Sequence, residues 1–509
     1  MKISSHRLSL AKAGREFYNI HITNPYITNL KITICCYAHG GFMFLGRDRE
    51  LSALESEYNA KGFRMTILYG RRRVGKTELL NKFSEDKDVI FFTASEASTE
   101  SNLTGFETAV FEALSPGGVH PHFQSFEEAF LYIGDNTGKK KLLVIIDEYP
   151  YLAESDKSIS SVLQKCIDTD WKEKNIYIIL CGSSISFMED EVLAGKSPLY
   201  GRRTSQLDLL PFNYKESAEF VPEYTFEEKA IVYGVTGGVA KYLELFDAGL
   251  SLGDNIKRLF FSESGYLFEE PKNLLRQEFR DISLYSTVIE AVAGGATKMN
   301  EISQKTGIST AGLTQALNKL IKVRIIKKFI PILNEKNKRY SGYAVGDGMF
   351  GFWYRFVARG TTAITRGFGS QFFDARVKPY IHEYMGYVFE EMCQEYVMEK
   401  GIIGSLPVFV NETGKWTGQD NEKKQPSDID VVGIDRVNKQ AVIGECKFRN
   451  KQADSTEIEA LADRKRLLAP YDVKDMLYFS LGGYDKGAIG KGEELGVRLL
   501  GISDIYLHI

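Results

Sequence analysis

The sequence has few cysteines and no metal-binding arrangement of them. Only six occur in 509 residues, and none forms a Cys-x-x-Cys pair or a Cys/His cluster with zinc spacing. In so long a chain, scattered thiols are typical of reduced cysteines in a cytosol. The sequence therefore gives no sign of a zinc site, and it predicts a cytoplasmic protein.

Long apolar runs and an excess of charge are also missing. No stretch of eighteen apolar residues occurs, and the N-terminus lacks the apolar segment of a secretory signal, so we expect no membrane span. The formal net charge is only −3. A surface for nucleic acid would therefore have to be local, because the molecule as a whole is not basic.

The sequence has the composition of an ordinary globular protein, and the chain is too long for a single hydrophobic core. Hydrophobic residues make up 43% and charged residues 26%, and 509 residues suggest three or four domains. Residues 1–42 show no clear period, whereas Met43 opens a segment that resembles a natural start. We therefore expect residues 1–42 to be an upstream extension.

A phosphate-binding loop is the clearest motif. The apolar run 65–69 predicts a buried strand, and the residues after Thr77 predict a helix. Strand, glycine-rich loop and helix are the setting in which backbone N–H groups and the helix N-terminus bind phosphates. Lys76 is expected to contact the β- and γ-phosphates of ATP, and Thr77 to bind Mg²⁺. The predicted loop consists of Gly70, Arg71, Arg72, Arg73, Val74, Gly75, Lys76 and Thr77.

A second motif supports ATP hydrolysis. Residues 142–146 form an apolar run that ends in Asp147 and Glu148, which is a Walker B pattern. Asp147 is expected to hold Mg²⁺ through water, and Glu148 to orient or deprotonate the attacking water. The alternative is a strand that ends in a solvated acidic turn.

Two further positions are candidates for the same site. Ser183 follows the apolar run 175–181 and suits a γ-phosphate sensor, with Ser184 as the alternative and a helix N-cap as the competing interpretation. Arg202 is a candidate arginine finger, acting within the chain or from a neighbouring subunit of a homo-oligomer. The alternative for Arg202 is an ordinary surface arginine.

These motifs together resemble the archaeal-type ATPase family, which belongs to the AAA+/STAND-like P-loop ATPases. The resemblance covers about residues 43–250 and rests on the loop, on Gly182-Ser183-Ser184, and on the segments 44–51, 197–202 and 237–243. In the last segment Ala240 replaces the family's proline, a departure that concerns the start of a helix. The resemblance implies a five-stranded parallel sheet over residues 43–215 and a helical lid over 216–280.

Residues 281–346 predict a winged helix-turn-helix. Three helices are expected at 283–293, 298–305 and 309–323, followed by two wing strands at 325–332 and 340–345. The segment 315–340 is locally basic, so we expect DNA as a partner. The alternative is a winged helix that only packs against the ATPase core. The basic residues are Lys319, Lys322, Arg324, Lys327, Lys328, Lys336, Lys338 and Arg339.

A connector over residues 347–369 leads to a C-terminal domain over 370–509 with an acidic constellation. A helix is predicted at 381–396 with Glu390 at the flank of its apolar face. Two strands follow, with Asp430 at the start of the first and with Glu445 and Lys447 on one face of the second. Asp430 and Glu445 are expected to bind Mg²⁺, while Lys447 orients a water molecule or stabilises charge.

This constellation is similar to the PD-(D/E)xK nuclease motif. Residues 370–509 also resemble a domain of unknown function that is fused to archaeal-type ATPases, with Asp428 where that family has glutamate. The resemblance implies a restriction-endonuclease-like α/β fold. The alternative is a degenerate scaffold that binds DNA without cutting it.

The complete chain is thus expected to be an α/β protein, for which three functions remain open. The first is an ATPase that controls a metal-dependent DNA nuclease. The second is a nucleotide-dependent switch that binds DNA without cleavage, and the third is a structural partner in a larger assembly.

Overall fold

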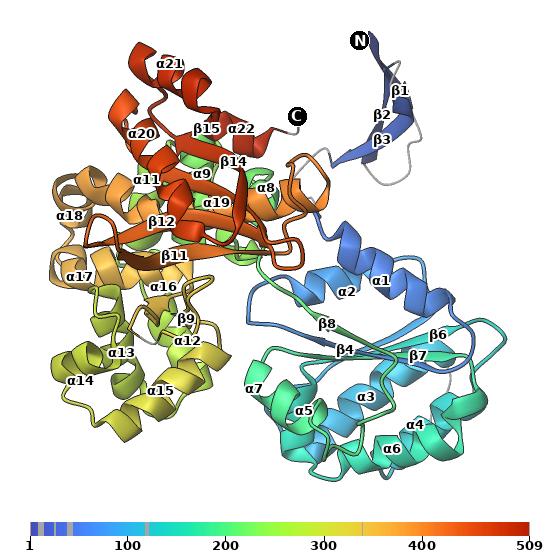
Figure 1. Ribbon diagram of the computed structural model, residues 1–509. Helices are drawn as coiled ribbons and strands as arrows, with labels where there is room; N and C mark the ends of the chain where they lie inside the picture. The colour runs from blue at the N-terminus through green and yellow to red at the C-terminus, as the bar shows by residue number, and fades with distance from the viewer. Residues whose placement is uncertain are drawn as a thin grey trace.

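Two lobes of unequal size make up most of the chain. The computed structural model describes the backbone of residues 2–8, 15–24 and 27–37, and backbone and side chains of 44–117, 122–337 and 339–507. The first lobe, blue to teal in Figure 1, contains residues 44–208, and the second, green to red, contains residues 212–507. Lys338 and Met43 lie outside the described residues.

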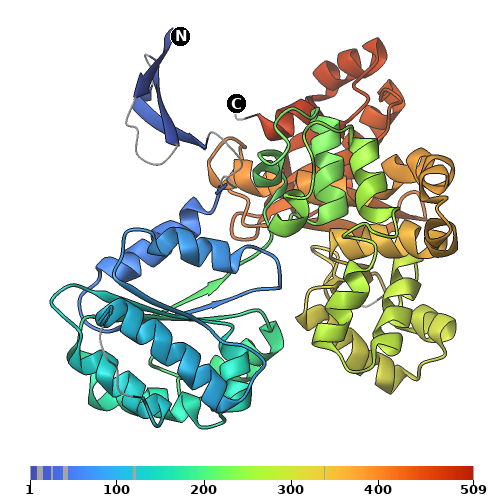
Figure 2. The same ribbon diagram turned by 180° about the vertical axis from the view of Figure 1, so that it is seen from behind.

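The N-terminal segment contains a small antiparallel sheet. Its strands pair in the order β1-β2-β3 and stand apart from both lobes in Figures 1 and 2. The sequence showed no clear period here, so these strands were not anticipated. Their bounds are Lys2–Leu8 for β1, Arg15–Asn24 for β2 and Ile27–Tyr37 for β3.

The first lobe is built on a parallel sheet of five strands with the order β5-β6-β7-β4-β8. This confirms the expected sheet of a P-loop NTPase fold. Strand β4 lies between β7 and β8, so the strand order reverses beside it. In open α/β sheets, ligands bind at such a switch point. The strands are β4 (Arg64–Tyr69), β5 (Val89–Thr93), β6 (Leu142–Asp147), β7 (Ile176–Gly182) and β8 (Ser205–Asp208).

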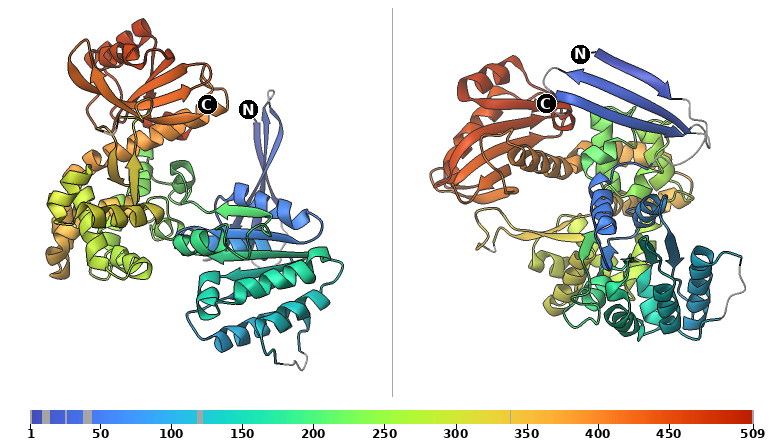
Figure 3. Two further views of the ribbon diagram at one scale, coloured as in Figure 1. Left: turned by 60° about the horizontal axis from the view of Figure 1, so that its bottom comes forward. Right: turned by 90° about the vertical axis from the view of Figure 1, so that its right-hand side faces the viewer.

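Helices cover both faces of this sheet, which explains why its central strands are continuous apolar runs. One face packs against α1 and α2, and the other packs against α3 to α6. Figure 3 shows the helices on either side of the strands. The helices are α1 (Asp48–Asn59), α2 (Lys76–Ser84), α3 (Thr99–Leu114), α4 (Phe126–Asp135), α5 (Tyr149–Ser155), α6 (Ile159–Thr169) and α7 (Ile185–Phe187).

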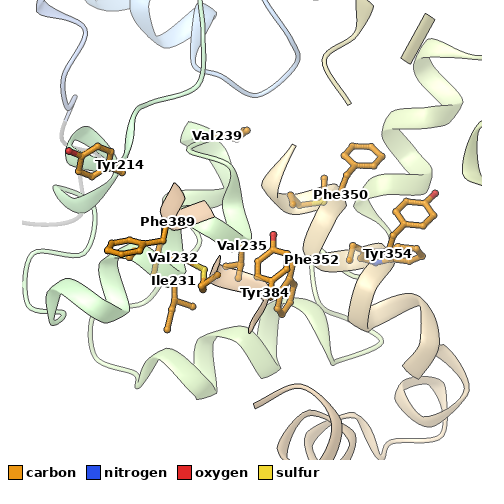
Figure 4. Close-up of a cluster of buried hydrophobic side chains, with 14 of the residues drawn as sticks. Tyr214, Ile231, Val232, Val235, Val239, Phe350, Phe352, Tyr354, Tyr384 and Phe389 are labelled. Carbon is orange, nitrogen blue, oxygen red and sulfur yellow. The ribbon is translucent and has the colours of Figure 1, made fainter. Parts of the chain in front are cut away.

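The second lobe begins with five helices over the region expected to form a lid. Helix α10 begins at Ala240 itself, so the missing proline leaves the helix start in place. Figure 4 shows residues of α9, such as Val232, beside Phe352 and Tyr384, which belong to later helices. These helices therefore share their core with the C-terminal half of the chain. They are α8 (Tyr214–Ala218), α9 (Phe226–Thr236), α10 (Ala240–Leu243), α11 (Leu252–Phe260) and α12 (Glu270–Glu278).

Three helices and an antiparallel strand pair follow, close to the predicted bounds, although the first strand ends earlier than expected. They are α13 (Ile282–Ala293), α14 (Met299–Thr306), α15 (Thr310–Lys322), β9 (Ile326–Phe329) and β10 (Gly342–Val345). The expected connector is largely helical, and Phe350 and Trp353 lie in the core. Its helices and the next are α16 (Gly348–Phe352), α17 (Ala358–Thr365) and α18 (Gly369–Arg376).

The C-terminal sheet has the order β11-β12-β13-β14-β15, antiparallel among the first three strands and parallel among the last three. One face packs on α19 (Ile381–Ile402) and the other on α20 (Ser455–Arg464) and α21 (Lys486–Leu495). The chain ends in α22 (Ile502–Tyr506), which packs on α9. The strands are β11 (Glu412–Asp420), β12 (Gln425–Asp435), β13 (Gln440–Lys447), β14 (Asp472–Ser480) and β15 (Val497–Gly501).

Two expectations about this sheet need correction. The sequence indicated a two-stranded hairpin, whereas β11 adds a third antiparallel strand. Asp430 was placed at the start of its strand, but β12 begins at Gln425 because its N-terminal part pairs with β11.

Among the described residues, no helix combines the length and apolar character that a membrane span requires.

Candidate functional sites

The glycine-rich loop lies at the end of β4, where its backbone follows a path that only glycine can take. A Cβ on Gly70 would lie 2.3 Å from the carbonyl oxygen of Leu209, and Gly75 caps α2 with a φ of 93°. Lys76 Nζ donates hydrogen bonds to the carbonyl oxygens of Gly70 and Arg71, each at 3.0 Å. Burial lowers the pKa of Lys76. The loop thus holds a desolvated ammonium group beside the N-terminus of α2.

The acidic residues at the end of β6 meet this loop. Thr77 Oγ1 donates to Asp147 Oδ2 at 2.8 Å, so the two residues expected to serve Mg²⁺ are adjacent. Glu148 Oε2 accepts from Ser183 Oγ at 2.7 Å. Ser184 instead caps α7 by accepting from the backbone N–H of Phe187 at 3.4 Å. The geometry therefore brings Ser183 to Glu148 and gives Ser184 the capping position.

Both lobes line the cavity in front of the loop. The first lobe contributes the loop, Glu148, Ser183 and the segment around Phe44, and the second lobe contributes residues around α8, α10 and α12. The second lobe contributes six residues, of which only Ala240 and Lys241 belong to a motif segment of the sequence, 237–243. The six residues are Phe212, Phe220, Ala240, Lys241, Glu244 and Gln277.

Arg47 joins three parts of the cavity. Its Nη2 donates to the carbonyl oxygen of Val74 at 3.0 Å, and its guanidinium carbon lies 3.9 Å from the ring centroid of Phe212. Burial lowers the pKa of this arginine. The sequence identified Arg47 only as part of a family motif, because its contacts lie 27 and 165 positions further along the chain.

Two arginines of the loop form ion pairs with the second lobe. Arg71 pairs with Asp347, and Arg73 pairs with Glu270. Both carboxylates are buried, and Tyr242 Oη donates to Glu270 Oε1 at 2.6 Å. The phosphate-binding loop is thus tied to residues just before α16 and at the start of α12.

Arg202 does not join the site within this chain. Its Nη2 lies 2.8 Å from Asp168 Oδ2, and it is absent from the residues that line the cavity. An arginine-finger role for Arg202 within one chain therefore has no support in this arrangement. A role in trans stays a prediction.

The predicted basic surface is divided among several partners. Lys322 Nζ lies 2.6 Å from Asp190 Oδ2 in the first lobe, and Arg324 pairs with Asp208 at the end of β8. Lys327 pairs with Glu391 of α19. Among the basic residues that the structure describes, those that remain exposed are Lys319, Lys328, Lys336 and Arg339.

The acidic constellation lies where two strands of the C-terminal sheet separate. The pairing of β12 with β13 runs from Asp435 and Gln440 to Val431 and Gly444. Beyond it, the backbone N–H of Cys446 donates to Asp430 Oδ2 at 3.4 Å. The structure thus places Asp430 opposite the segment that carries Glu445 and Lys447.

Three cations compensate the carboxylates. Lys447 Nζ lies 2.6 Å from Glu445 Oε1 and 3.6 Å from Asp430 Oδ2, and Arg464 of α20 pairs with Glu445. Lys415 of β11, which the sequence did not indicate, lies 2.8 Å from Asp430 Oδ1. Lys415 Nζ also lies 3.4 Å from both carboxylate oxygens of Glu390.

Burial and neighbouring charges shift the pKa values of the three acids in different directions. Burial, followed by the nearby Asp430, raises the pKa of Glu390 to about 7. Burial also acts to raise the pKa of Asp430, but Lys415 and Lys447 outweigh it and bring that pKa below its usual value. Burial and Asp430 raise the pKa of Glu445.

The donor atoms suit a hard divalent cation. Asp430 and Glu445 present carboxylate oxygens from neighbouring strands, and Mg²⁺ needs only one or two such ligands because it keeps several waters. The described residues contain no group of three His, Cys, Asp or Glu side chains close enough to hold a metal ion. At the nucleotide site, the hydroxyl oxygen of Thr77 and the carboxylate of Asp147 are likewise oxygen donors.

Two family models match the chain. Residues 44–246 match an ATPase domain described as predominantly from Archaea. Residues 353–458 match a family described as archaeal and bacterial proteins of unknown function. The second match overlaps the acidic constellation without assigning a role to it.

Two individual proteins are similar to parts of the chain. An uncharacterized protein of Methanocaldococcus jannaschii is 29% identical over 442 residues, which cover 86% of this chain and 95% of that protein. An uncharacterized ATP-binding protein of the same organism is 49% identical over 51 residues, 10% of this chain and 86% of that protein.

A solved structure shows the fold. The Walker-type ATPase of Pyrococcus abyssi is 21% identical with a TM-score of 0.50, and the likeness covers 61% of this chain and 96% of that one. Together with the loop geometry, these matches show that residues 44–246 belong to the family of ATPase domains found predominantly in Archaea, and that the chain is a nucleotide-binding ATPase.

Proposed function

We propose that the chain is a Mg²⁺-dependent ATPase whose nucleotide state controls a metal-dependent nuclease acting on DNA. The observation that carries the nuclease is the meeting of Asp430, Glu445 and Lys447 where β12 and β13 separate. Burying two carboxylates beside an ammonium group on one face of a sheet costs folding free energy, and a bound metal ion would give these groups a role. In this proposal residues 281–346 form a winged helix, and residues 370–509 form a restriction-endonuclease-like domain.

At the nucleotide site each residue has a distinct task. The loop backbone and Lys76 bind the phosphates, while Thr77 and Asp147 would hold Mg²⁺. Glu148 receives the proton of the attacking water, and Ser183 positions the Glu148 carboxylate through the 2.7 Å hydrogen bond. The bound ion would neutralise charge that develops on the phosphates.

At the acidic site, Asp430 and Glu445 would hold a divalent ion, and such an ion would polarise the scissile phosphate. Lys447 lies beside both carboxylates and can orient a water molecule, while Glu390 completes the polar wall. The exposed basic residues of the wing, Lys328 and Lys336 among them, would contact the DNA backbone.

Communication between the sites follows from the ion pairs of the loop. Arg73 lines the cavity and would be attracted by ATP phosphates, and Arg71 lies two residues before it in the loop. Binding of nucleotide would therefore compete with the pairs that these arginines form with Glu270 and Asp347. Asp347 lies two residues after the end of β10, and Glu270 begins α12. Nucleotide binding would therefore shift the lid and the wing relative to the first lobe.

A specific observation favours a second candidate, a nucleotide-dependent switch without cleavage. Lys322, Arg324 and Lys327 are engaged inside the molecule and so contribute less to a DNA surface. In this case the wing region serves as a contact between lobes. A homo-oligomer in which Arg202 reaches the site of a neighbouring subunit is compatible with either candidate.

One set of assays separates these functions. Supercoiled and linear DNA are incubated with Mg²⁺ or Mn²⁺, with and without ATP, using wild type, Lys76→Ala and Asp430→Ala. We expect Asp430→Ala to abolish cleavage and Lys76→Ala to abolish its response to ATP. The exposed Asp472 offers a matched control, because Asp472→Ala changes a carboxylate of the same domain away from the site.

The outcomes are distinct. Absence of cleavage under every condition contradicts the nuclease, and retained DNA binding then supports the switch. For hydrolysis, Glu148→Gln should bind ATP but lose turnover, by roughly 10²- to 10⁴-fold for a general base. Retained turnover in this variant would remove Glu148 from its proposed role.

A further inference from the structure

Lys415 stands at the centre of the acidic site. Its Nζ lies 2.8 Å from Asp430 Oδ1, 3.0 Å from Asp428 Oδ2 and 3.4 Å from both carboxylate oxygens of Glu390. Oxygens of three carboxylates therefore surround one ammonium group. The negative charge of these carboxylates is thus concentrated around Lys415, which compensates part of it.

The backbone fixes this placement. Gly414 pairs with Val432, whereas Trp416 pairs with Ile429, so the single residue Lys415 faces two residues of β12. Such a β-bulge re-aims the side chains beside it, and bulges are common next to active sites. Lys415 and Asp430 therefore face each other because of strand register and not through a free choice of rotamer.

The edge of β11 is held from outside the domain. The backbone N–H of Ile332 donates to the carbonyl oxygen of Lys415 at 3.0 Å, and Asn334 Nδ2 donates to that of Thr417 at 3.0 Å. The segment after β9 thus fixes the strand that carries Lys415. A change in the position of the wing would be felt at this lysine.

We propose that Lys415 is a resident counter-ion of the acidic site, and that a divalent metal ion binds there only when the ammonium group withdraws. The inference rests on the proposed metal site at Asp430 and Glu445. The Lys415 ammonium group and a divalent cation carry like charges, so they compete for the carboxylate of Asp430, which Lys415 contacts at 2.8 Å. Lys415 is consequently a positioning residue that sets how tightly the site holds its metal.

The test measures metal binding without DNA or nucleotide. Mn²⁺ is titrated by calorimetry, and free Mn²⁺ is followed by electron paramagnetic resonance, on the full chain in four forms. These are wild type, Lys415→Met, Asp430→Asn and the control Lys423→Met, which removes a lysine of the same domain that pairs with Asp463 at 2.8 Å. Methionine keeps the aliphatic stem of lysine and removes the charge.

We expect Lys415→Met to bind Mn²⁺ at the Asp430-dependent site roughly tenfold or more tightly than wild type, because a like charge is removed. Lys423→Met should match wild type. The thermal unfolding midpoint of each form shows whether the fold is kept, and Lys415→Gln serves as a second variant that removes the charge.

Two results would overturn the inference and leave the metal site standing. Unchanged Mn²⁺ affinity in Lys415→Met shows that the ammonium does not compete. Weaker affinity shows that Lys415 supports the ligands instead. Absence of any Asp430-dependent Mn²⁺ binding, in wild type and in Lys415→Met alike, overturns the proposed metal site itself.

Discussion

Single residues at the nucleotide site contact residues that are distant from them in the sequence. Arg47 is 5% exposed, donates to the carbonyl oxygen of Val74 and lies over the ring of Phe212. A charged hydrogen bond is worth about 1.5–3 kcal/mol, and a partly desolvated cation–π contact adds about 1 kcal/mol. Arg47 therefore stabilises the loop and the wall of the cavity together.

Arg47→Ala should weaken ATP binding by roughly tenfold or more, since a loss of about 1.4 kcal/mol already has that effect. The thermal unfolding midpoint should also fall. Arg49, exposed and two residues away, provides the control, and Arg49→Ala should leave both quantities near wild type. Binding of a fluorescent ATP analogue gives the affinity, and equal affinity in the two variants would contradict the role of Arg47.

At the scale of elements, helix α19 connects the C-terminal sheet with helix α9. It packs on β11, β12 and β13 and contacts α9. Near its C-terminal half, burial and then Glu216 raise the pKa of Glu395 to about 7, with Glu399 acting in the same direction and Lys215 against it. This contact between α19 and the α8 region is thus sensitive to protonation.

Glu395→Gln should raise the thermal unfolding midpoint at pH 8 and have little effect at pH 5. The folded state binds a proton that the unfolded state releases between the usual pKa of 4.5 and about 7. The wild type therefore loses stability as pH rises through this interval, and glutamine removes the loss. Glu383→Gln, at an exposed position of the same helix, is the control. A gain of equal size at both pH values would contradict this account.

At the scale of the whole molecule, polar contacts join two lobes that have separate apolar cores. The first lobe packs around its parallel sheet, while the core of the second runs from Phe212 to Ile505. Across the junction lie Arg71 with Asp347 and Arg324 with Asp208. Ion pairs can exchange partners without repacking a core, which suits a junction that responds to nucleotide.

Asp347→Asn tests this junction. Asparagine can still cap α16, where Asp347 accepts from the N–H of Phe350 at 2.9 Å, but it loses the charge that pairs with Arg71. Breaking a buried pair costs about 3 kcal/mol or more. We expect faster proteolysis between the lobes and a larger radius of gyration without ATP.

The exposed pair of Lys257 and Asp374, at 2.8 Å, supplies the control for this prediction. Asp374→Asn should change the unfolding midpoint and the proteolysis rate little, because exposed pairs contribute about 0–1 kcal/mol. Identical behaviour of Asp347→Asn and Asp374→Asn would show that the loop pair does not hold the lobes together.

The sequence by itself determined those features whose residues are neighbours along the chain. The loop from Gly70 to Thr77 and the acidic end of β6 could be predicted because strand, turn and helix follow directly, and the parallel sheet followed from the family resemblance. Asp430, Glu445 and Lys447 could be grouped because strand periodicity fixes which residues share a face. Strand β11 was missed because its polar residues and glycines show no apolar alternation, and it forms only by pairing with β12.

Only the tertiary structure decided how these local features meet. Arg71 and Asp347 are 276 positions apart, and Lys415 reaches Asp430 through a bulge in strand register. No local period encodes such contacts, because they arise from how packed elements bring distant charges together. Packing also turned Lys322 and Arg324 from a predicted DNA surface toward the first lobe, where three carboxylates compensate their charge.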